Sequence, residues 1–96
     1  MNEARQVEME NWVVDFIDER RKKNGMTIDQ LAAEVYPGVP TPSARMRIQG
    51  LRKPQGANGK RKRLLYSEFL LMAKAVGLTP SEVVTLTSQA FEELRT

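Results

Sequence analysis

The chain has 96 residues, a formal net charge of +3 and an apolar content typical of folded proteins, which together predict one domain over residues 1–96. It contains no cysteine and no histidine, so it offers no disulfide, no thiolate or imidazole metal site and no histidine base. Its apolar runs are much shorter than the ~20 residues of a membrane span, and its first ten residues are polar and acidic, unlike a secretory signal. We therefore expect a cytoplasmic domain with no metal, no cofactor and no membrane contact.

The positive charge is concentrated in one part of the sequence. Between Val35 and Ser67 there are eight basic residues and no acidic residue. The basic residues are Arg45, Arg47, Arg52, Lys53, Lys60, Arg61, Lys62 and Arg63. Subtracting these eight charges from +3 leaves a net charge of −5 for the rest of the chain. A basic segment without acidic residues of its own favours a polyanionic partner over a simple solvated loop.

The first helix is predicted over residues 7–23, where apolar residues recur at helical spacing. Its apolar face comprises Met9, Trp12, Val13, Phe16 and Ile17, and its polar face comprises Asp15, Asp18, Glu19 and Arg21. Gly25 is a suitable stop after a basic last turn. Residues 1–6 are expected to form a frayed N-terminal extension.

A second helix is predicted to begin after Thr27, because Thr27 and Gln30 have the spacing of a capping box. Its apolar stripe comprises Ile28, Leu31, Ala32 and Val35. Pro37 and Gly38 are expected to end it. The result is a short helix with a narrow apolar side.

The third helix is predicted between Thr41, as its N-cap, and Pro54, which stops it; Pro42 suits the first helical position. Its buried stripe is predicted to comprise Ala44, Ile48 and Leu51. The opposite side carries Pro42, Ser43, Met46 and Gln49, with Arg45 and Arg47 at its edges. Gly50 weakens the last turn.

Residues 54–63, which we call the basic loop, contain proline, two glycines and four consecutive basic residues, and they predict a loop. A fourth helix is predicted over residues 67–76, ending at Gly77. A fifth begins with a second capping box, with Thr79 as N-cap and Glu82 three residues later. The fifth helix is expected to continue to the end of the chain, and its apolar side comprises Val83, Leu86, Ala90, Phe91 and Leu94.

Two short helices joined by a turn predict a helix-turn-helix over residues 27–52, with the third helix in the major groove of DNA. Its exposed side chains include donors that pair with base edges. The candidates for base contacts are Ser43, Arg45, Arg47 and Gln49. The candidates for phosphate contacts are Thr27, Thr41, Arg52, Lys53, Lys60, Arg61, Lys62 and Arg63. The predicted partner is double-stranded DNA, with the basic loop on its backbone contributing more to affinity than to sequence choice.

The order of these segments resembles the helix-turn-helix DNA-binding domains of the lambda repressor and Cro type, the XRE-like family. The matching segments are RRKKNGMTIDQLAAEV, TPSARMRIQGLRKP and LLYSEFLLMAKAVGLTPSEVV. The resemblance implies an all-α, five-helix, lambda-repressor-like fold. It implies a sequence-specific transcriptional regulator of bacterial or phage type, located at the nucleoid. It also implies a homodimer, in which we expect the fifth helix to pair with its symmetry mate.

Three features depart from the family pattern. Ile28 stands where the family often has a glutamine that contacts phosphate. The connection over residues 36–40 is about two residues longer than the usual turn, which leaves the register of the recognition helix open by one or two residues. The basic loop is also longer and more basic than the common form.

Two other functions stay open at this stage. An antitoxin would bind a toxin partner as well as DNA, and a protein-interaction adaptor would keep the fold without binding DNA. The absence of the glutamine favours the adaptor, whereas the basic excess favours DNA binding. We expect no enzyme, because the sequence has no histidine or cysteine, no phosphate-binding glycine loop and no paired carboxylates in a basic pocket.

The aromatic residues are assigned to structure rather than to ligand binding. Trp12, Phe16 and Phe69 fall at core spacing and offer no platform for stacking RNA bases. Tyr36 and Tyr66 fit either the core or its rim.

Overall fold

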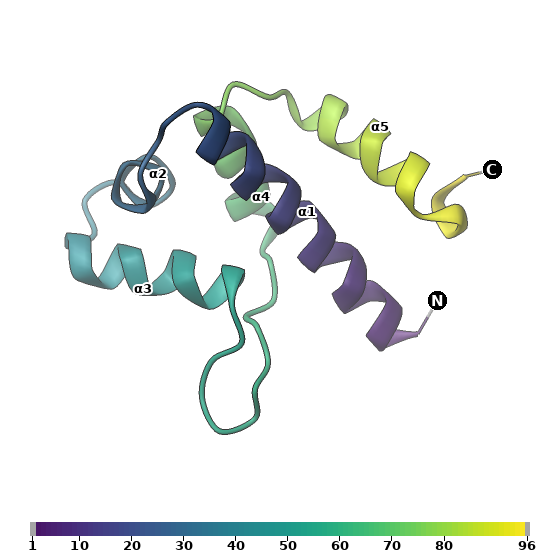
Figure 1. Cartoon of the computed structure of the whole chain (residues 1–96), viewed down its shortest axis with the longest axis horizontal. Coiled ribbons are helices and arrows are strands. Elements are labelled where there is room, and N and C mark those ends of the chain that lie inside the picture. Colours follow the sequence, from purple (N-terminus) through teal and green to yellow (C-terminus); the bar gives the residue numbers. More distant parts are fainter. Residues whose placement is uncertain (1, 96) are drawn as a thin grey trace.

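The computed structural model describes residues 2–95 and contains five α-helices, followed by one short 3₁₀ helix (Figure 1). The elements are α1 (Glu3–Lys23), α2 (Ile28–Val35), α3 (Thr41–Arg52), α4 (Tyr66–Ala75), α5 (Pro80–Ala90) and η1 (Glu92–Leu94). No strand forms within residues 2–95, where an isolated antiparallel bridge joins Gln55 and Lys60. The prediction of an all-α fold with five helices is confirmed.

Helix α1 begins four residues earlier than the apolar pattern indicates. The side chain of Asn2 caps it by accepting a hydrogen bond from the backbone N–H of Arg5 at 2.9 Å. The Arg5 guanidinium in turn donates to Glu93, which ties this first turn to the C-terminal segment. The two ends of the chain accordingly lie on the same side of the molecule in Figure 1. The prediction that residues 1–6 are frayed is therefore wrong for residues 2–6, which form the cap and first turn of α1. Met1 lies outside the described residues.

Both predicted capping boxes are present. The Thr27 hydroxyl accepts from Gln30 N–H at 3.1 Å, and the Gln30 side chain accepts from Thr27 N–H at 2.8 Å. Thr79 and Glu82 make the corresponding pair at the start of α5. Each box satisfies amide groups that the first turn of a helix leaves without a partner.

The start of α3 differs from the prediction. Pro40, not Thr41, is the N-cap, so Thr41 is the first helical residue and Pro42 the second. The Pro40 carbonyl begins the helix by accepting from Ala44 N–H at 3.0 Å, and no side chain caps the remaining amides. The N-terminus of α3 therefore keeps free backbone donors and the positive end of its dipole.

Helix α5 also ends earlier than predicted. Phe91 is extended, with φ −121° and ψ 109°, and η1 follows it. Phe91 is 4% exposed, and its ring meets that of Trp12 edge-on, with ring centroids 6.1 Å apart. The helix breaks because this turn brings the ring into the core, where burial of a phenyl group is worth about 1.5–3 kcal/mol.

The core takes at least one fully buried side chain from every α-helix. These side chains are Ile17, Leu31, Ile48, Met72 and Val83, each at most 1% exposed. The predicted stripe of α3 is confirmed, since Ala44, Ile48 and Leu51 are all buried. The aromatic residues assigned to the core, Trp12, Phe16 and Phe69, are partly buried and pack against it.

A buried ionic cluster joins α1 to the last turn of α3. Asp18 and Arg21 are each 8% exposed, which corrects their assignment to the polar face of α1. Asp18 Oδ1 accepts from Arg21 Nε at 2.8 Å. Arg52 Nε lies 3.0 Å from the same oxygen, an ion-pair distance at which its N–H is not aligned for a hydrogen bond. Burial raises the pKa of Asp18, but the two guanidinium groups outweigh it and hold the pKa below its usual value.

The substitution Asp18→Asn is expected to lower the free energy of unfolding by about 3 kcal/mol at pH 7, because it leaves two guanidinium groups without their shared carboxylate. The folded-state pKa is lowered, so this stabilisation is present above the unfolded value of about 3.9 and is lost as the pH falls further. Urea unfolding at pH 7 and at pH 3 measures both effects.

The matched control is Glu19→Gln, the neighbouring carboxylate, whose side chain is 66% exposed. It is expected to change stability by less than about 0.5 kcal/mol. Equal stability of the two variants at pH 7 would contradict the assigned role of Asp18.

Candidate nucleic-acid interface

Helices α2 and α3 are joined by residues 36–40 and pack against each other (Figure 1). The buried stripe of α3 faces the body of the molecule. On its outward side, Ser43 and Arg45 are exposed, and the Met46 side chain is 73% exposed. The helix therefore presents one long side to solvent while its other side is fixed.

Arg45 forms an exposed, bidentate ion pair with α2. Its Nε and Nη2 donate to the two carboxylate oxygens of Asp29 at 2.7 and 2.8 Å. The hydrogen bonds from Arg45 lower the pKa of Asp29. Both side chains are about half exposed, at 49% and 44%. A pair in this environment contributes little to stability, so Arg45 can exchange its carboxylate for another ligand at small cost.

Arg47 lies on the flank of α3, between two residues from other elements. Its guanidinium carbon is 5.2 Å from the centre of the Tyr36 ring, and its Nη2 is 3.4 Å from Glu68. Glu68 is 5% exposed and also accepts from the Tyr36 hydroxyl and from Leu65 N–H. Burial and the neighbouring Glu68 raise the pKa of Tyr36 to about 12. Arg47 is thus held at the side of the helix by a cation–π contact and a buried carboxylate.

Glu68 is not among the residues predicted from the sequence to have a role. A usable signal was present, because Glu68 stands at the third position of α4 and its side chain bonds to the N–H of Leu65, the N-cap. The apolar residue at the cap position conceals this half of a capping box.

Gln49 and Arg52 contact each other at the end of α3. Arg52 donates to the Gln49 side-chain oxygen and pairs with Asp18, and its own side chain is 14% exposed. The structure therefore places Arg52 inside the α1–α3 contact, with Gln49 half-buried beside it.

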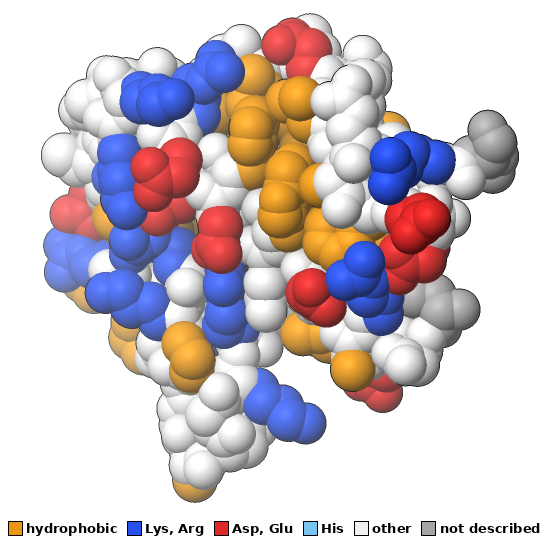
Figure 2. All heavy atoms as spheres, turned by 45° about the vertical axis from the view of Figure 1, so that its right-hand side comes forward, with side chains coloured by type: hydrophobic (Ala, Val, Ile, Leu, Met, Phe, Trp, Pro, Cys, Tyr) orange, Lys and Arg blue, Asp and Glu red, His pale blue; other side chains and the backbone are white. Residues whose placement is uncertain are grey.

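Acidic residues of α1 pair with two arginines of the basic loop. Arg61 donates from Nε to the carbonyl of Leu51 at 2.8 Å and from Nη2 to Asp15 at 2.9 Å. Arg63 Nη2 lies 2.6 Å from Glu10, whose pKa the Arg63 hydrogen bond lowers. Basic side chains are interleaved with acidic ones on the face in Figure 2. The segment that has no acidic residue in sequence is therefore partly neutralised in the fold.

Three lysines of the basic segment remain exposed and form no ion pair with residues 2–95; they are Lys53, Lys60 and Lys62. The basic loop is closed by a hydrogen bond from Gln55 N–H to the Lys60 carbonyl at 3.0 Å. Gly56 and Gly59 have φ of 68° and 63°, which glycine adopts without strain. The loop projects from the body below α3 (Figure 1).

The two threonine candidates lie at helix N-termini. Thr27 caps α2, and Thr41 is the first residue of α3; both are exposed. The helix dipole makes both ends suitable for phosphate. The uncapped α3 also offers free amides, whereas the capping box of α2 already occupies those of Thr27 and Gln30.

Comparisons of the chain with models of protein families, with curated proteins and with solved structures gave no match. The resemblance to the lambda repressor and Cro family therefore stays a prediction that rests on the motifs quoted above.

Among residues 2–95, no three acidic side chains gather in a way that would hold a metal ion. No single helix in this range is long and apolar enough to cross a membrane. Helices α4 and α5 together have the necessary length and composition, but they are bent by 109° relative to each other.

A second surface is apolar. A groove of about 360 Å³ lies where α1, the start of α4 and α5 meet. Its apolar lining comprises Met9, Val13, Leu64, Leu65, Tyr66, Phe69, Val84 and Leu94, and we call it the apolar groove. Tyr66 is 74% exposed and Val84 is 52% exposed. Tyr66 therefore belongs to the surface, whereas Tyr36 is partly buried.

Proposed function

We propose that this chain is a sequence-specific DNA-binding transcriptional regulator in which α2 and α3 act as a helix-turn-helix. The observation that carries the proposal is the two-sided character of α3. Its inner stripe is locked into the core, while its outer side and uncapped N-terminus are exposed beside basic groups. An α-helix presented in this way fits the major groove, where base edges are distinguishable.

The base contacts in this proposal come from Ser43, Arg45, Arg47 and Gln49. Arg45 is the principal candidate, because its planar guanidinium already makes a bidentate contact and would make the same kind of contact with guanine. Arg47 reaches bases only by leaving Tyr36 and Glu68. Gln49 has the smallest exposed fraction of the four.

The phosphate contacts divide into two groups. Lys53, Lys60 and Lys62 supply exposed positive charge. The helix N-termini at Thr27 and Thr41 supply the positive ends of two helix dipoles, and the uncapped α3 also supplies backbone donors. Arg52, Arg61 and Arg63 act mainly as braces that fix the end of α3 and the basic loop against α1.

A second copy of the chain is the proposed occupant of the apolar groove. The groove presents projecting side chains, Tyr66 and Val84, next to a hollow of its own. A twofold axis lets each copy insert these side chains into the hollow of the other. Two linked recognition helices gain affinity on a short operator by avidity.

Selection of bound sequences from a random double-stranded pool is expected to enrich one motif. With three lysines on phosphates, log Kobs plotted against log salt is expected to have a slope of about −3, steeper if Arg45 or Arg47 also reaches phosphate. Arg45→Ala is expected to relax sequence choice, whereas Lys53→Ala weakens all sequences by a similar factor.

The control is Arg61→Ala, which is expected to lower stability by about 1 kcal/mol with a smaller effect on the salt slope. Affinity that does not depend on salt, or the absence of any enriched motif, would contradict the proposal and favour the adaptor. Enrichment together with a co-purifying protein partner would favour the antitoxin.

The variant Val84→Glu is expected to shift the protein from dimer to monomer in sedimentation velocity, because it places a carboxylate in the apolar contact. It is also expected to reduce affinity for a palindromic site by tenfold or more through the loss of avidity. Thr85→Glu, a neighbouring exposed position on α5 outside the groove lining, is the matched control. Wild-type protein that is monomeric at high concentration and on DNA would exclude the dimer.

A further inference from the structure

Gly50 occupies a position in α3 that its backbone does not explain. It lies in the last turn of the helix, is buried, and has no positive φ. Alanine is the better helix former at such a position. A Cβ at Gly50 would lie 2.9 Å from Cδ of Lys62 and 3.2 Å from its Cγ and Cε. The glycine therefore leaves a notch that the aliphatic part of Lys62 fills.

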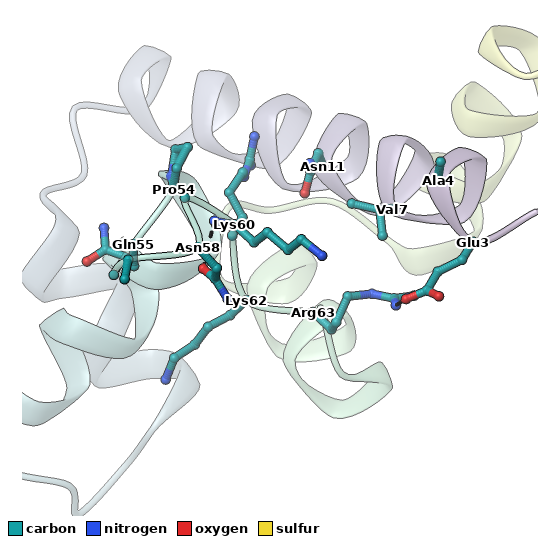
Figure 3. Close-up of a pocket in the computed structure, with 14 residues that line it drawn as sticks. Glu3, Ala4, Val7, Asn11, Pro54, Gln55, Asn58, Lys60, Lys62 and Arg63 are labelled. Carbon is teal, nitrogen blue, oxygen red and sulfur yellow. Dashed lines mark hydrogen bonds and ion pairs between the residues drawn. The ribbon is translucent and has the colours of Figure 1, made fainter.

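The backbone fixes Lys62 at the same place. Its N–H donates to the Gly50 carbonyl at 2.8 Å. The residues on either side are braced to α1, Arg61 by Asp15 and Arg63 by Glu10. Figure 3 shows the Lys62 side chain extending away from Arg63. It is exposed and forms no ion pair within residues 2–95.

We propose that Gly50 is a positioning residue, whose missing side chain lets Lys62 lie across the last turn of α3 and present its ammonium group as a pre-ordered phosphate contact beside the recognition helix. This inference rests on the proposed function. A long cation that is already ordered loses less conformational freedom when it binds. A Cβ at any of the other five glycines would have no atom within 4 Å, so neither Lys53 nor Lys60 packs into a glycine notch. We therefore expect Lys62 to contribute more to affinity than either.

The fold is expected to tolerate Gly50→Ala, because the close neighbour is the flexible part of a lysine and not backbone. The variant separates the two roles of Gly50. As a structural glycine, its loss would affect stability alone. As a positioning residue, its loss displaces Lys62 and weakens DNA binding while the melting temperature stays the same or rises.

The test is a double-mutant cycle on DNA affinity with Gly50→Ala, Lys62→Met and the double variant; methionine keeps the aliphatic contact and removes the charge. Lys62→Met is expected to weaken binding about tenfold and to lower the salt slope by about 1. Gly50→Ala is expected to weaken binding about fivefold. The double variant is expected to bind no more weakly than Lys62→Met alone, whereas Gly50→Ala and Lys60→Ala are expected to add.

Additive losses in the Gly50–Lys62 pair, or unchanged affinity of Gly50→Ala, would overturn the inference and leave the proposed function intact. A wild-type protein that binds no DNA would overturn the proposed function itself. A measurement without DNA separates the two cases. Nuclear Overhauser contacts between the Gly50 α-protons and the Lys62 side-chain methylenes are expected in the wild type. Their absence would contradict the packing of Lys62 in the notch and so overturn the inference.

Discussion

The placement of α3 depends on the buried carboxylate of Asp18. One oxygen of this group meets Arg21 of α1 and Arg52 at the end of α3, and Arg21 also donates to the Met26 carbonyl at 2.7 Å. The apolar stripe packs α3 against the core, but apolar burial is non-directional and sets the orientation of a helix only loosely. A charged contact at a single atom restricts that freedom, since moving away leaves buried charge without a partner. The outward side of α3 is thereby fixed in direction.

Pairing of α1 carboxylates with arginines also holds the basic loop in place. Helix α1 carries Asp15 and Glu10 on the side that faces the basic loop, and these carboxylates hold Arg61 and Arg63. Arginine suits this bracing role because its planar guanidinium can bind both oxygens of a carboxylate, whereas the ammonium group of lysine is a compact charge that is strongly hydrated. In this part of the chain, arginines mainly form ion pairs that hold the basic loop and the end of α3 against α1. The exposed positive charge comes mainly from lysines. Figure 2 shows the result as mixed charge beside a continuous band of hydrophobic side chains.

Features set by neighbours in sequence were predictable, and features set by distant neighbours were not. The caps at Thr27 and Thr79 and the stripe of α3 depend on residues three or four positions apart. The pairing of Arg61 with Asp15 spans 46 residues, so counting charges along the segment overestimated its free positive charge. The break at Phe91 likewise follows from a ring that packs on Trp12, which no local pattern encodes. Gln49 is likewise less exposed than the other three base-contact candidates, which its position on α3 alone does not predict.

The central claim is that the outward side of α3 and the basic loop bind duplex DNA. It is tested most directly by following the backbone amide resonances of the protein during titration with an enriched duplex. The account predicts the largest shifts at residues 41–49, at the N-terminus of α2 and at Lys53, Lys60 and Lys62. Shifts confined to the apolar groove, or none at saturating DNA, would contradict it.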